Sequence, residues 1–456
     1  MQTTSSRTKM KTINGDSLTP ILIFRRLQGK YKFLLESSAQ HEGAGRFSFI
    51  GANPRKTYKG VGQEIQEYSY QTGKTYVHKG ELFALLKRLM PRISNTTEFP
   101  FSGGAVGYIG HGGTSMLQTD AKNLPDIHFH VYETVIIFDH VTDEVTLIHT
   151  NINVEKQEPD LEDLAQQLLQ GHPSEEATYM FQTLDTSTQD QFSNALQNIQ
   201  RNLNGEMTRA ILPKRYLAKF QGDTFSLYRQ LRKKKPDAYM YYVEFEDYVV
   251  LGTSPESLIR VKGEQVIATP TEGTYPRGGT KSDDLENERK LYNHLEIRKS
   301  HAVLVSAVQQ ELQSVCFRDS VQVIDAMRIV KSKQALHMTS SIEGQLLPML
   351  HALDVLAAML PPYATTGIAK EQATHYFEKW HQPASIFGGA LGFIGFNGHL
   401  DFALTGQSIV VKQAIMHMQS TIEVTKYTDI LSVLQQVEEE ERAYLQLLDN
   451  NGGQNE

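Results

Sequence analysis

The chain has 456 residues, 40% of them hydrophobic and 21% charged, which is ordinary for a folded protein with a large core or two domains. Its 52 acidic and 45 basic residues give a net charge of -7, whereas nucleic-acid binders need a basic face to neutralise phosphates. The single cysteine, Cys316, excludes an intramolecular disulfide and a zinc site made of several thiolates.

The sequence carries no signal for membrane insertion or export. No run approaches the roughly 18 apolar residues of a membrane-spanning helix. The opening residues have no apolar core, so we expect no signal peptide. Together with the low cysteine content, these features predict a cytoplasmic protein.

Strand and helix patterns alternate in the first third of the chain. Apolar strand patterns occupy residues 31–37, 46–51, 75–80 and 133–150. The last of these predicts a hairpin, because two apolar runs flank a cluster of turn residues at 139–143. Apolar residues at helical spacing predict helices at residues 80–90 and 160–170.

A polar stretch at residues 171–190 has little apolar periodicity and predicts a boundary. We therefore expect an N-terminal region at residues 1–175 and a second region at residues 186–450.

The second region mixes helices with antiparallel strand pairs. Helices are predicted at residues 189–206, 224–237, 285–312, 351–362 and 429–448. Strands are predicted at residues 208–220, 238–254, 256–270 and 334–346, before a glycine-punctuated hairpin at 387–412. This mixture predicts the α+β class.

Two distant stretches spell nearly the same strand. Residues 102–110 read SGGAVGYIG and residues 387–395 read FGGALGFIG. Glycine inside a strand marks a position where another backbone or a ligand approaches closely. The pair indicates related positions in the fold, with a chance likeness between two glycine-rich strands as the alternative.

Six segments in chain order resemble the anthranilate synthase component I family. They are FLLESSAQHEGAGRFSFIGANP (33–54), SGGAVGYIG (102–110), DAYMYYVEFEDYVVLGTSPESL (237–258), PTEGTYPRGG (270–279), ALHMTSSIEG (335–344) and FGGALGFIGFNGHLDFAL (387–404). Each motif alone is weak, but their shared order over roughly residues 19–444 is specific.

The resemblance implies a fold, a reaction and several partners. The fold is a layered α/β/β/α sandwich of two large antiparallel sheets, built from internally repeated α/β units. The family binds chorismate with Mg²⁺: ammonia adds to the ring, the ring hydroxyl leaves and pyruvate is eliminated. A glutamine amidotransferase subunit supplies the ammonia, and tryptophan feeds back on activity. This chain has no amidotransferase signature, so that subunit would be another chain.

The resemblance also implies a tryptophan pocket formed by two segments. Glu36 and Ser37 match one wall, and Ala238, Tyr239 and Met240 match the other. Glu36 and the Ser37 hydroxyl would bind the polar ends of the amino acid, with Tyr239 and Met240 around the indole. The alternative is a buried strand ending in a polar turn, with Tyr239 and Met240 as core residues.

Several active-site positions hold the residues that the resemblance implies. Gly273 and Thr274 match a pair that contacts substrate, where glycine permits close backbone approach. Glu256 matches the carboxylate that protonates the leaving hydroxyl, and His337 matches a histidine near the ring. Lys370 matches a lysine of a later motif. As alternatives, Glu256 caps a turn and His337 is a satisfied core histidine.

Other positions depart from the family pattern. Ser300 and Gln436 stand where the family binds Mg²⁺ with glutamates, and Gln407 stands where an arginine grips a substrate carboxylate. Phe387 replaces a tyrosine at a substrate position, and Arg209 replaces a glutamine characteristic of this branch. Further departures lie at Gln309, Gln310, Glu311, Tyr363, Ala364, Thr421, Ile422, Glu423 and Val433.

These departures put Mg²⁺ binding in question, because a hard divalent cation binds weakly without carboxylates. Glu272 and the glutamates at 438–441 are the neighbours that would replace the lost ligands, and Arg209 is the neighbour that would replace the lost arginine. The alternative for residues 438–441 is a solvated helix face.

Three functions remain open. The whole-chain resemblance favours an anthranilate synthase component I, a lyase of tryptophan biosynthesis inhibited by tryptophan. The departures leave a catalytically inactive tryptophan-binding regulator as the second interpretation. The third is an aminodeoxychorismate or isochorismate/salicylate synthase, although Arg209 does not supply the lysine base of the isochorismate branch because arginine stays protonated.

Overall fold

The computed structural model describes residues 8–37, 45–93, 97–110, 124–152, 159–175, 177–184, 189–203, 209–255, 257–333, 335–367, 370 and 386–449. Within them, the side chains of residues 189–191, 209 and 213 are not described.

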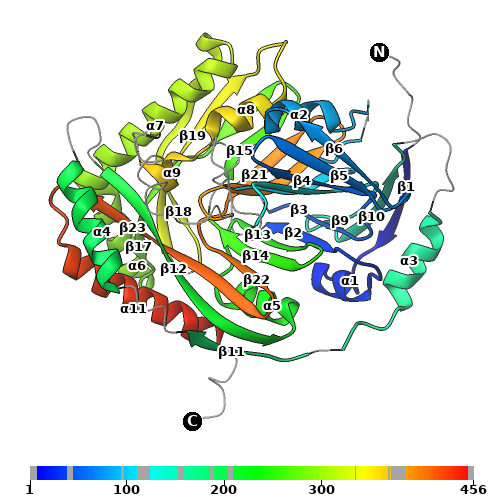
Figure 1. Cartoon of the computed structure of the whole chain (residues 1–456), viewed down its shortest axis with the longest axis horizontal. Helices are drawn as coiled ribbons and strands as arrows, with labels where there is room; N and C mark the ends of the chain where they lie inside the picture. The colour runs from blue at the N-terminus through cyan, green and yellow to red at the C-terminus, as the bar shows by residue number, and fades with distance from the viewer. Residues whose placement is uncertain are drawn as a thin grey trace.

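Two large antiparallel sheets pack face to face, with helices on their outer faces (Figure 1). One sheet has 11 strands and the other has 12. The architecture confirms the predicted α+β class and the layered α/β/β/α sandwich.

The 11-stranded sheet places its strands in the following order. They are β1 (Thr8–Asn14), β10 (Glu144–Thr150), β9 (Thr134–Asp139), β3 (Phe47–Gly51), β2 (Phe33–Ser37), β13 (Tyr239–Glu244), β14 (Tyr248–Ser254), β22 (Ser408–Lys412), β23 (Ile415–Thr425), β12 (Arg209–Gly222) and β11 (Tyr179–Leu184).

The 12-stranded sheet is arranged in the same antiparallel manner. Its order is β17 (Thr271–Pro276), β19 (Ala335–Gln345), β16 (Gln265–Ala268), β15 (Ser257–Lys262), β21 (Leu400–Leu404), β20 (Ala390–Gly395), β7 (Gly104–Ile109), β8 (Ile127–Tyr132), β4 (Lys56–Val61), β5 (Glu64–Ser69) and β6 (Lys74–Lys79), and β18 (Gln322–Lys331) also pairs with β19.

The helices divide between the two outer faces and the end of the sandwich. Those against the 11-stranded sheet are α1 (Pro20–Arg26), α3 (Leu161–Gln170) and α5 (Thr224–Lys234). Those against the 12-stranded sheet are α2 (Leu82–Leu89), α7 (Leu295–Val315) and α8 (Ala352–Met359). The helices α4 (Gln189–Asn202) and α11 (Ile430–Leu448) pack on β12 and β23 of the 11-stranded sheet, and α6 (Lys281–Asn293) packs beside β17 and β19 of the 12-stranded sheet. The short helices are α9 (Tyr363–Thr366) and the 3₁₀ helix η2 (Arg318–Ser320).

The layer between the sheets is rich in aromatic side chains. Phe33 and Phe49 from the 11-stranded sheet pack with Phe101 and Phe393, and the ring centroids of Phe49 and Phe393 are 5.6 Å apart. All six residues of β7 are buried, because this strand is covered on both faces.

Three expected elements are each divided in the structure. The single strand predicted at residues 256–270 is a hairpin of β15 and β16. The single helix predicted at residues 285–312 is α6 followed by α7, because His294 ends α6 and its side chain accepts the Ile297 backbone N–H. The single strand predicted at 238–254 is a hairpin of β13 and β14. Its turn escaped notice because Phe245 in the turn is buried like a strand residue.

The two similar glycine-rich stretches form neighbouring strands. β7 pairs antiparallel with β20 in the middle of the 12-stranded sheet, and Gly107 lies directly opposite Gly392. A Cβ on Gly107 would lie 1.9 Å from the backbone oxygen of His128, and a Cβ on Gly392 would lie 1.9 Å from that of Asp401. The expected close approach of another backbone is confirmed, since each glycine admits the strand beside it.

The two predicted regions contribute strands to the same sheets. β2 pairs with β13 in one sheet, and β7 pairs with β20 in the other. The predicted boundary between the two regions, near residues 175–186, stays a prediction.

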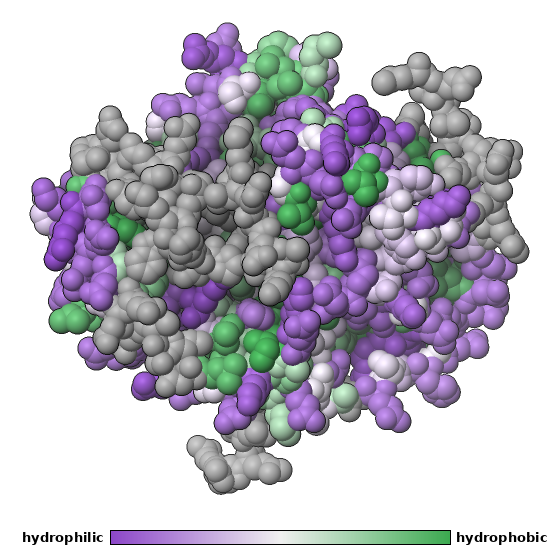
Figure 2. Space-filling view, viewed as in Figure 1, coloured by the Kyte–Doolittle hydropathy of each residue, from purple (hydrophilic) through white to green (hydrophobic). Residues whose placement is uncertain are grey.

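The described surface in Figure 2 is mostly hydrophilic, with hydrophobic residues in small separate groups. Among the helices that the structure describes, none combines the length and apolarity required to cross a membrane.

Candidate functional site

A pocket of about 800 Å³ is lined by strands of both sheets, β12 and β23 from one and β17 and β19 from the other. Of the residues assigned to the active site from the sequence, Gly273, Thr274, His337 and Gln407 line it. The structure therefore brings together residues from three separate parts of the sequence.

A β-bulge shapes one wall of this pocket. At Gly273, β17 shifts its register against β19, with a φ of +82° that favours glycine. A Cβ here would lie 2.4 Å from Cγ2 of Ile297. Immediately after the bulge Thr274 pairs with His337, and its Oγ1 lies 3.2 Å from His337 Nδ1.

Lys235 supplies positive charge at the position of the lost arginine. Lys235 caps the C-terminus of α5 just before Pro236, which cannot continue the helix. The Lys235 ammonium donates to the side-chain oxygen of Gln407. Burial lowers the pKa of Lys235, while Asp237 and Glu440 oppose that shift. Among the described side chains that line the pocket, Lys235 is the one lysine or arginine.

Two glutamates stand beside the expected metal positions. The Ser300 hydroxyl on α7 donates to Oε1 of Glu272 at 2.5 Å, and the Gln436 amide on α11 donates to Oε1 of Glu440 at 3.0 Å. Both Glu272 and Glu440 line the pocket. The carboxylates nearest to Ser300 and Gln436 in the pocket therefore belong to neighbouring residues.

One arrangement recurs at three departures from the family pattern. Each neutral residue hydrogen-bonds a neighbour that carries the charge expected at its own position. The pairs are Ser300–Glu272, Gln436–Glu440 and Gln407–Lys235.

The pocket offers the type of ligand atom that a hard divalent cation prefers. Asp237, Glu272, Glu423 and Glu440 line it, and carboxylate oxygens are the ligands that Mg²⁺ prefers, with one or two sufficing when substrate and water complete the shell. The same surplus of negative charge opposes a dianionic substrate unless a cation is bound with it.

Lys370 lies in a different setting from the one expected. It forms an ion pair with Glu311, and its Nζ is 4.0 Å from the ring centroid of Tyr363. Burial raises the pKa of Glu311 to about 7 and lowers the pKa of Lys370. Lys370 is not among the described residues that line the pocket, so its assignment as a catalytic group lacks geometric support.

Two other predicted residues fall outside what the structure describes. Glu256 is outside the described residues, although its neighbour Pro255 lines the pocket. Arg209 opens β12 opposite Thr425, and its side chain is not described.

The remaining departures divide between pocket and core. Thr421 and Glu423 line the pocket, whereas Ile422 between them is buried on the other face of β23. Phe387 is buried in the layer between the sheets and is not among the described residues that line the pocket, so its assignment to substrate binding stays a prediction.

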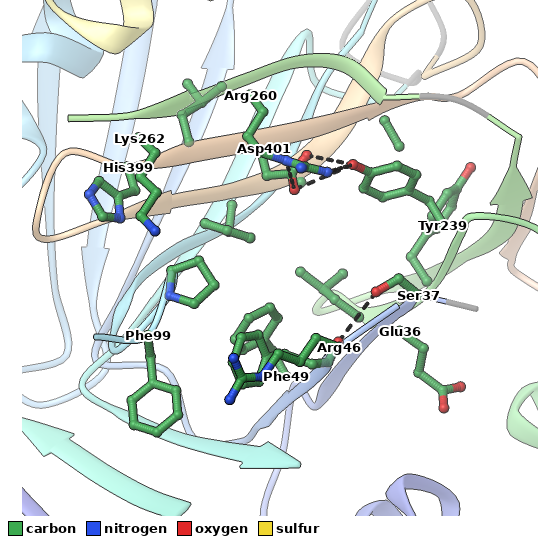
Figure 3. Close-up of a pocket in the computed structure, with 18 of the residues that line it drawn as sticks. Glu36, Ser37, Arg46, Phe49, Phe99, Tyr239, Arg260, Lys262, His399 and Asp401 are labelled. Atoms are coloured by element: carbon green, nitrogen blue, oxygen red, sulfur yellow. Dashed lines mark hydrogen bonds and ion pairs between the residues drawn. The ribbon is translucent and has the colours of Figure 1, made fainter. Parts of the chain in front are cut away.

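A second pocket, of about 570 Å³, contains the predicted tryptophan walls (Figure 3). The two walls are adjacent strands, since Ser37 of β2 pairs with Tyr239 of β13. Glu36, Ser37, Tyr239 and Met240 line this pocket. Ala238 is buried and is not among the described residues that line this pocket, so its assignment stays a prediction.

The carboxylate of Glu36 is engaged elsewhere. It accepts hydrogen bonds from the Tyr228 hydroxyl at 2.6 Å and from Arg232 at 2.8 and 3.1 Å. Figure 3 shows its side chain directed away from the other labelled residues. Arg232 therefore competes with a ligand ammonium for this carboxylate, and the expected role of Glu36 stays a prediction.

Other charged groups face this second pocket, and sequence reasoning missed them. Asp401 accepts from Arg260 and from the Tyr239 hydroxyl, both at 3.1 Å (Figure 3). Arg46 forms an ion pair with Asp139 at 2.8 Å. Asp401 offers an acceptor for an ammonium group, and Arg46 offers a donor for a carboxylate. The available signal was that Asp401 lies inside one of the recognised segments, opposite Arg260.

Sequence comparisons identify relatives over most of the chain. The model of the chorismate binding enzyme family matches residues 31–428. The chain is 30% identical to anthranilate synthase component 1 of Lactococcus lactis subsp. lactis over 430 residues, covering 90% of this chain and 93% of that protein. It is 28% identical to anthranilate synthase component 1 of Neisseria meningitidis, covering 94% and 92%.

Solved structures show the same fold. Anthranilate synthase component I from Streptococcus pneumoniae superimposes with a TM-score of 0.76 at 25% identity, covering 96% of this chain and 99% of that one. The menaquinone-specific isochorismate synthase of Escherichia coli gives a TM-score of 0.71 at 12% identity, covering 98% and 95%, a likeness of fold alone. With the family model matching most of its length, this chain belongs to the chorismate binding enzyme family.

Proposed function

We propose that the protein is an anthranilate synthase component I, which converts chorismate and ammonia into anthranilate, pyruvate and water. The named relatives with 28–30% identity support this reaction over others in the family. The observation that carries the proposal is the retained charge at three altered positions, because random loss of function would not keep a charged partner beside each one.

In the proposed site, Lys235 binds one carboxylate of chorismate together with Gln407. Gly273 and Thr274 form the wall against the substrate, and Thr274 holds the His337 ring beside it at 3.2 Å. Glu256 protonates the leaving hydroxyl, as the resemblance implies.

Glu272 and Glu440 are the residues that would hold Mg²⁺. The bound ion would neutralise carboxylate charge and so permit the dianionic substrate to enter an acidic pocket. Ser300 and Gln436 orient the two glutamates by their hydrogen bonds.

Ammonia is proposed to come from a glutamine amidotransferase subunit, in keeping with the name component 1 of the relatives. Tryptophan is proposed to bind the second pocket as a feedback inhibitor, with Asp401 facing its ammonium and Arg46 facing its carboxylate. The pocket volume of about 570 Å³ and its mixture of aromatic and charged walls support a ligand of this size.

The test is anthranilate fluorescence from purified protein with chorismate, Mg²⁺ and an ammonium salt at alkaline pH, where free ammonia replaces the partner. We expect turnover that EDTA abolishes and added Mg²⁺ restores. No product from protein that melts cooperatively would refute the enzyme and leave tryptophan binding without turnover. Isochorismate detected by chromatography instead would assign the protein to that branch.

A matched pair of variants tests the metal residues. Glu439 and Glu440 each accept a hydrogen bond from the glutamine four residues earlier, but only Glu440 lines the pocket. We expect E440Q to raise the Mg²⁺ concentration required for half-maximal rate at least 10-fold, roughly the effect of losing one charged ligand. E439Q should behave as the wild type, and equal effects would refute the assignment of Glu440.

A further inference from the structure

A cluster of two histidines and one glutamate includes no residue that lines either pocket described above. His128 and His130 lie on β8, and Glu246 lies in the turn between β13 and β14. Their candidate ligand atoms all lie within 4.8 Å of one another, and no other such group of three occurs among the described residues. The cluster joins the two sheets, since β8 and the β13–β14 hairpin belong to different ones.

The distances match those of a tetrahedral metal centre. His128 Nε2 lies 3.2 Å from Glu246 Oε2 and 3.1 Å from the Thr57 hydroxyl, a partner that a bound metal ion would replace. His130 Nε2 lies 3.4 Å from Glu246 Oε1. Tetrahedral bonds of about 2.0–2.1 Å place neighbouring ligand atoms roughly 3.3–3.4 Å apart. The longer contact exceeds the usual separation of a charged hydrogen bond, about 2.7–2.9 Å.

The other ring nitrogens have partners of the kind that orient metal ligands. His128 Nδ1 lies 2.6 Å from the Tyr248 hydroxyl, and His130 Nδ1 lies 3.3 Å from the Tyr132 hydroxyl. A histidine that binds a metal through one nitrogen usually makes a hydrogen bond through the other, which fixes the ring orientation.

The hydrogen bonds define the tautomer of His130. The Tyr132 hydroxyl donates to the backbone oxygen of Tyr31 at 2.6 Å, so its oxygen is left to accept from His130. His130 Nδ1 then carries the proton and Nε2 presents its lone pair. That lone pair faces a carboxylate oxygen of Glu246, and His130 Nε2 is buried without a hydrogen-bond partner. A cation between the two atoms removes this repulsion.

Both imidazoles suit neutral ligation. The side chains of His128 and His130 are fully buried, and burial holds the pKa of each below its usual value. The Glu246 side chain is 23% exposed and gives access from solvent.

Two further groups contact Glu246 from the open side. Lys59 Nζ lies 3.1 Å from Glu246 Oε2, and the Tyr70 hydroxyl donates to Glu246 Oε1 at 2.5 Å. Lys59 is 36% exposed and carries its charge on a flexible stem, so it can withdraw into solvent when a metal enters. Its position then becomes the open coordination site for water.

We propose that His128, His130 and Glu246 bind one divalent transition-metal ion of the Zn²⁺ class, which links the two sheets. Two imidazoles and one carboxylate favour such an ion over Mg²⁺ or Ca²⁺, which prefer oxygen ligands alone. The proposal is independent of the chorismate site.

The test uses the full chain, stripped with EDTA and then exchanged into buffer with excess Mg²⁺ to occupy oxygen-only sites. Titration with Co²⁺ should give visible absorption of tetrahedral or five-coordinate intensity that saturates at one equivalent. One equivalent of Zn²⁺ should abolish the absorption. Zn²⁺ should also raise the melting temperature, because it binds the folded state.

Three variants separate this site from adventitious binding. H130Q and E246Q should each weaken Co²⁺ binding at least about 100-fold. E246Q changes a partly exposed turn residue and tests the site if H130Q fails to fold. The control is H78Q, because His78 pairs with Glu67 at 3.0 Å in a half-buried histidine–glutamate contact without a third ligand.

Several outcomes would overturn the proposal. One is the absence of saturable Co²⁺ absorption in the wild type, which would mean that a proton on His130 satisfies Glu246. Another is full retention of binding in both H130Q and E246Q. Equal loss in H78Q would place the metal elsewhere.

Discussion

Exchanging the positive charge between Lys235 and Gln407 tests the proposed substrate site most directly. The Lys235 ammonium donates to the side chain of Gln407. Among the described residues that line the pocket, no other is a lysine or an arginine. K235Q removes one charge-assisted hydrogen bond to a substrate carboxylate, worth about 1.5–3 kcal/mol. This free energy corresponds to a decrease in kcat/KM of roughly 10- to 150-fold. Most of it should appear in KM, because the carboxylate binds similarly in the ground and transition states.

The double variant should recover what the single one loses. In K235Q/Q407R, the arginine returns the charge to position 407, and its planar fork suits a carboxylate. We expect kcat/KM within about 10-fold of wild type, since one charged contact has been restored. Q407R alone should be impaired, because two cations then lie side by side in a partly buried site.

The assay is the initial rate of anthranilate fluorescence against chorismate concentration, at fixed Mg²⁺ and ammonium. K234Q is the matched control, since Lys234 is the preceding residue of α5, is exposed and does not line the pocket. Thermal melts establish that each variant is folded. If K235Q keeps the wild-type kcat/KM, or loses no more than K234Q, then Lys235 does not contact the substrate and the reasoning from retained charge fails.

The second pocket should close when Ser37 becomes large and cationic, so S37R is expected to abolish tryptophan binding measured by calorimetry, and unchanged affinity would refute that site. Burial raises the pKa of Glu311 from 4.5 to about 7, so its stabilising contribution is present below pH 4.5 and is lost as the pH rises through 7. Between pH 4.5 and 7, the free energy of unfolding of the wild type should fall by up to about 3 kcal/mol relative to that of E311Q, at about 1.4 kcal/mol per pKa unit. Denaturant unfolding measures both values, and a difference that stays constant with pH would contradict the prediction. G107A should lower the free energy of unfolding by roughly 3 kcal/mol or more, whereas G406A should change it by less than about 0.5 kcal/mol, and equal stability of the two would show that the β7–β20 pair tolerates a side chain.

The sequence predicted most elements because their signals are local. The β9–β10 hairpin follows from turn residues between two apolar runs, and α5 ends where Pro236 follows it. The turn between β13 and β14 was missed since Phe245 within it is apolar and buried. Pairing of β7 with β20 was beyond local reasoning, because nothing in either strand specifies its partner.

Site prediction was least informative about side-chain direction. Adjacent residues in a strand point their side chains to opposite faces, so the side chains of Glu36 and Ser37 diverge although both residues line the second pocket. Strand alternation alone would have shown this, with Leu34 and Glu36 sharing the outer face. By contrast, the sequence does not show which of the four consecutive glutamates approaches the pocket, because that depends on how α11 packs. It does not single out Lys235 either, because this residue resembles any solvated lysine at the end of a helix.

The central pairing of β7 with β20 also constrains how a cell makes this protein. β7 ends at Ile109 and β20 begins at Ala390. At about 5–20 residues per second, synthesis of the intervening chain takes roughly 15–60 s. During that interval one edge of a strand destined for complete burial has no native neighbour, and such edges pair readily with other chains. Ribosome-associated chaperones would therefore protect the half-made sheet, and folding of its centre would wait until nearly the whole chain has been translated.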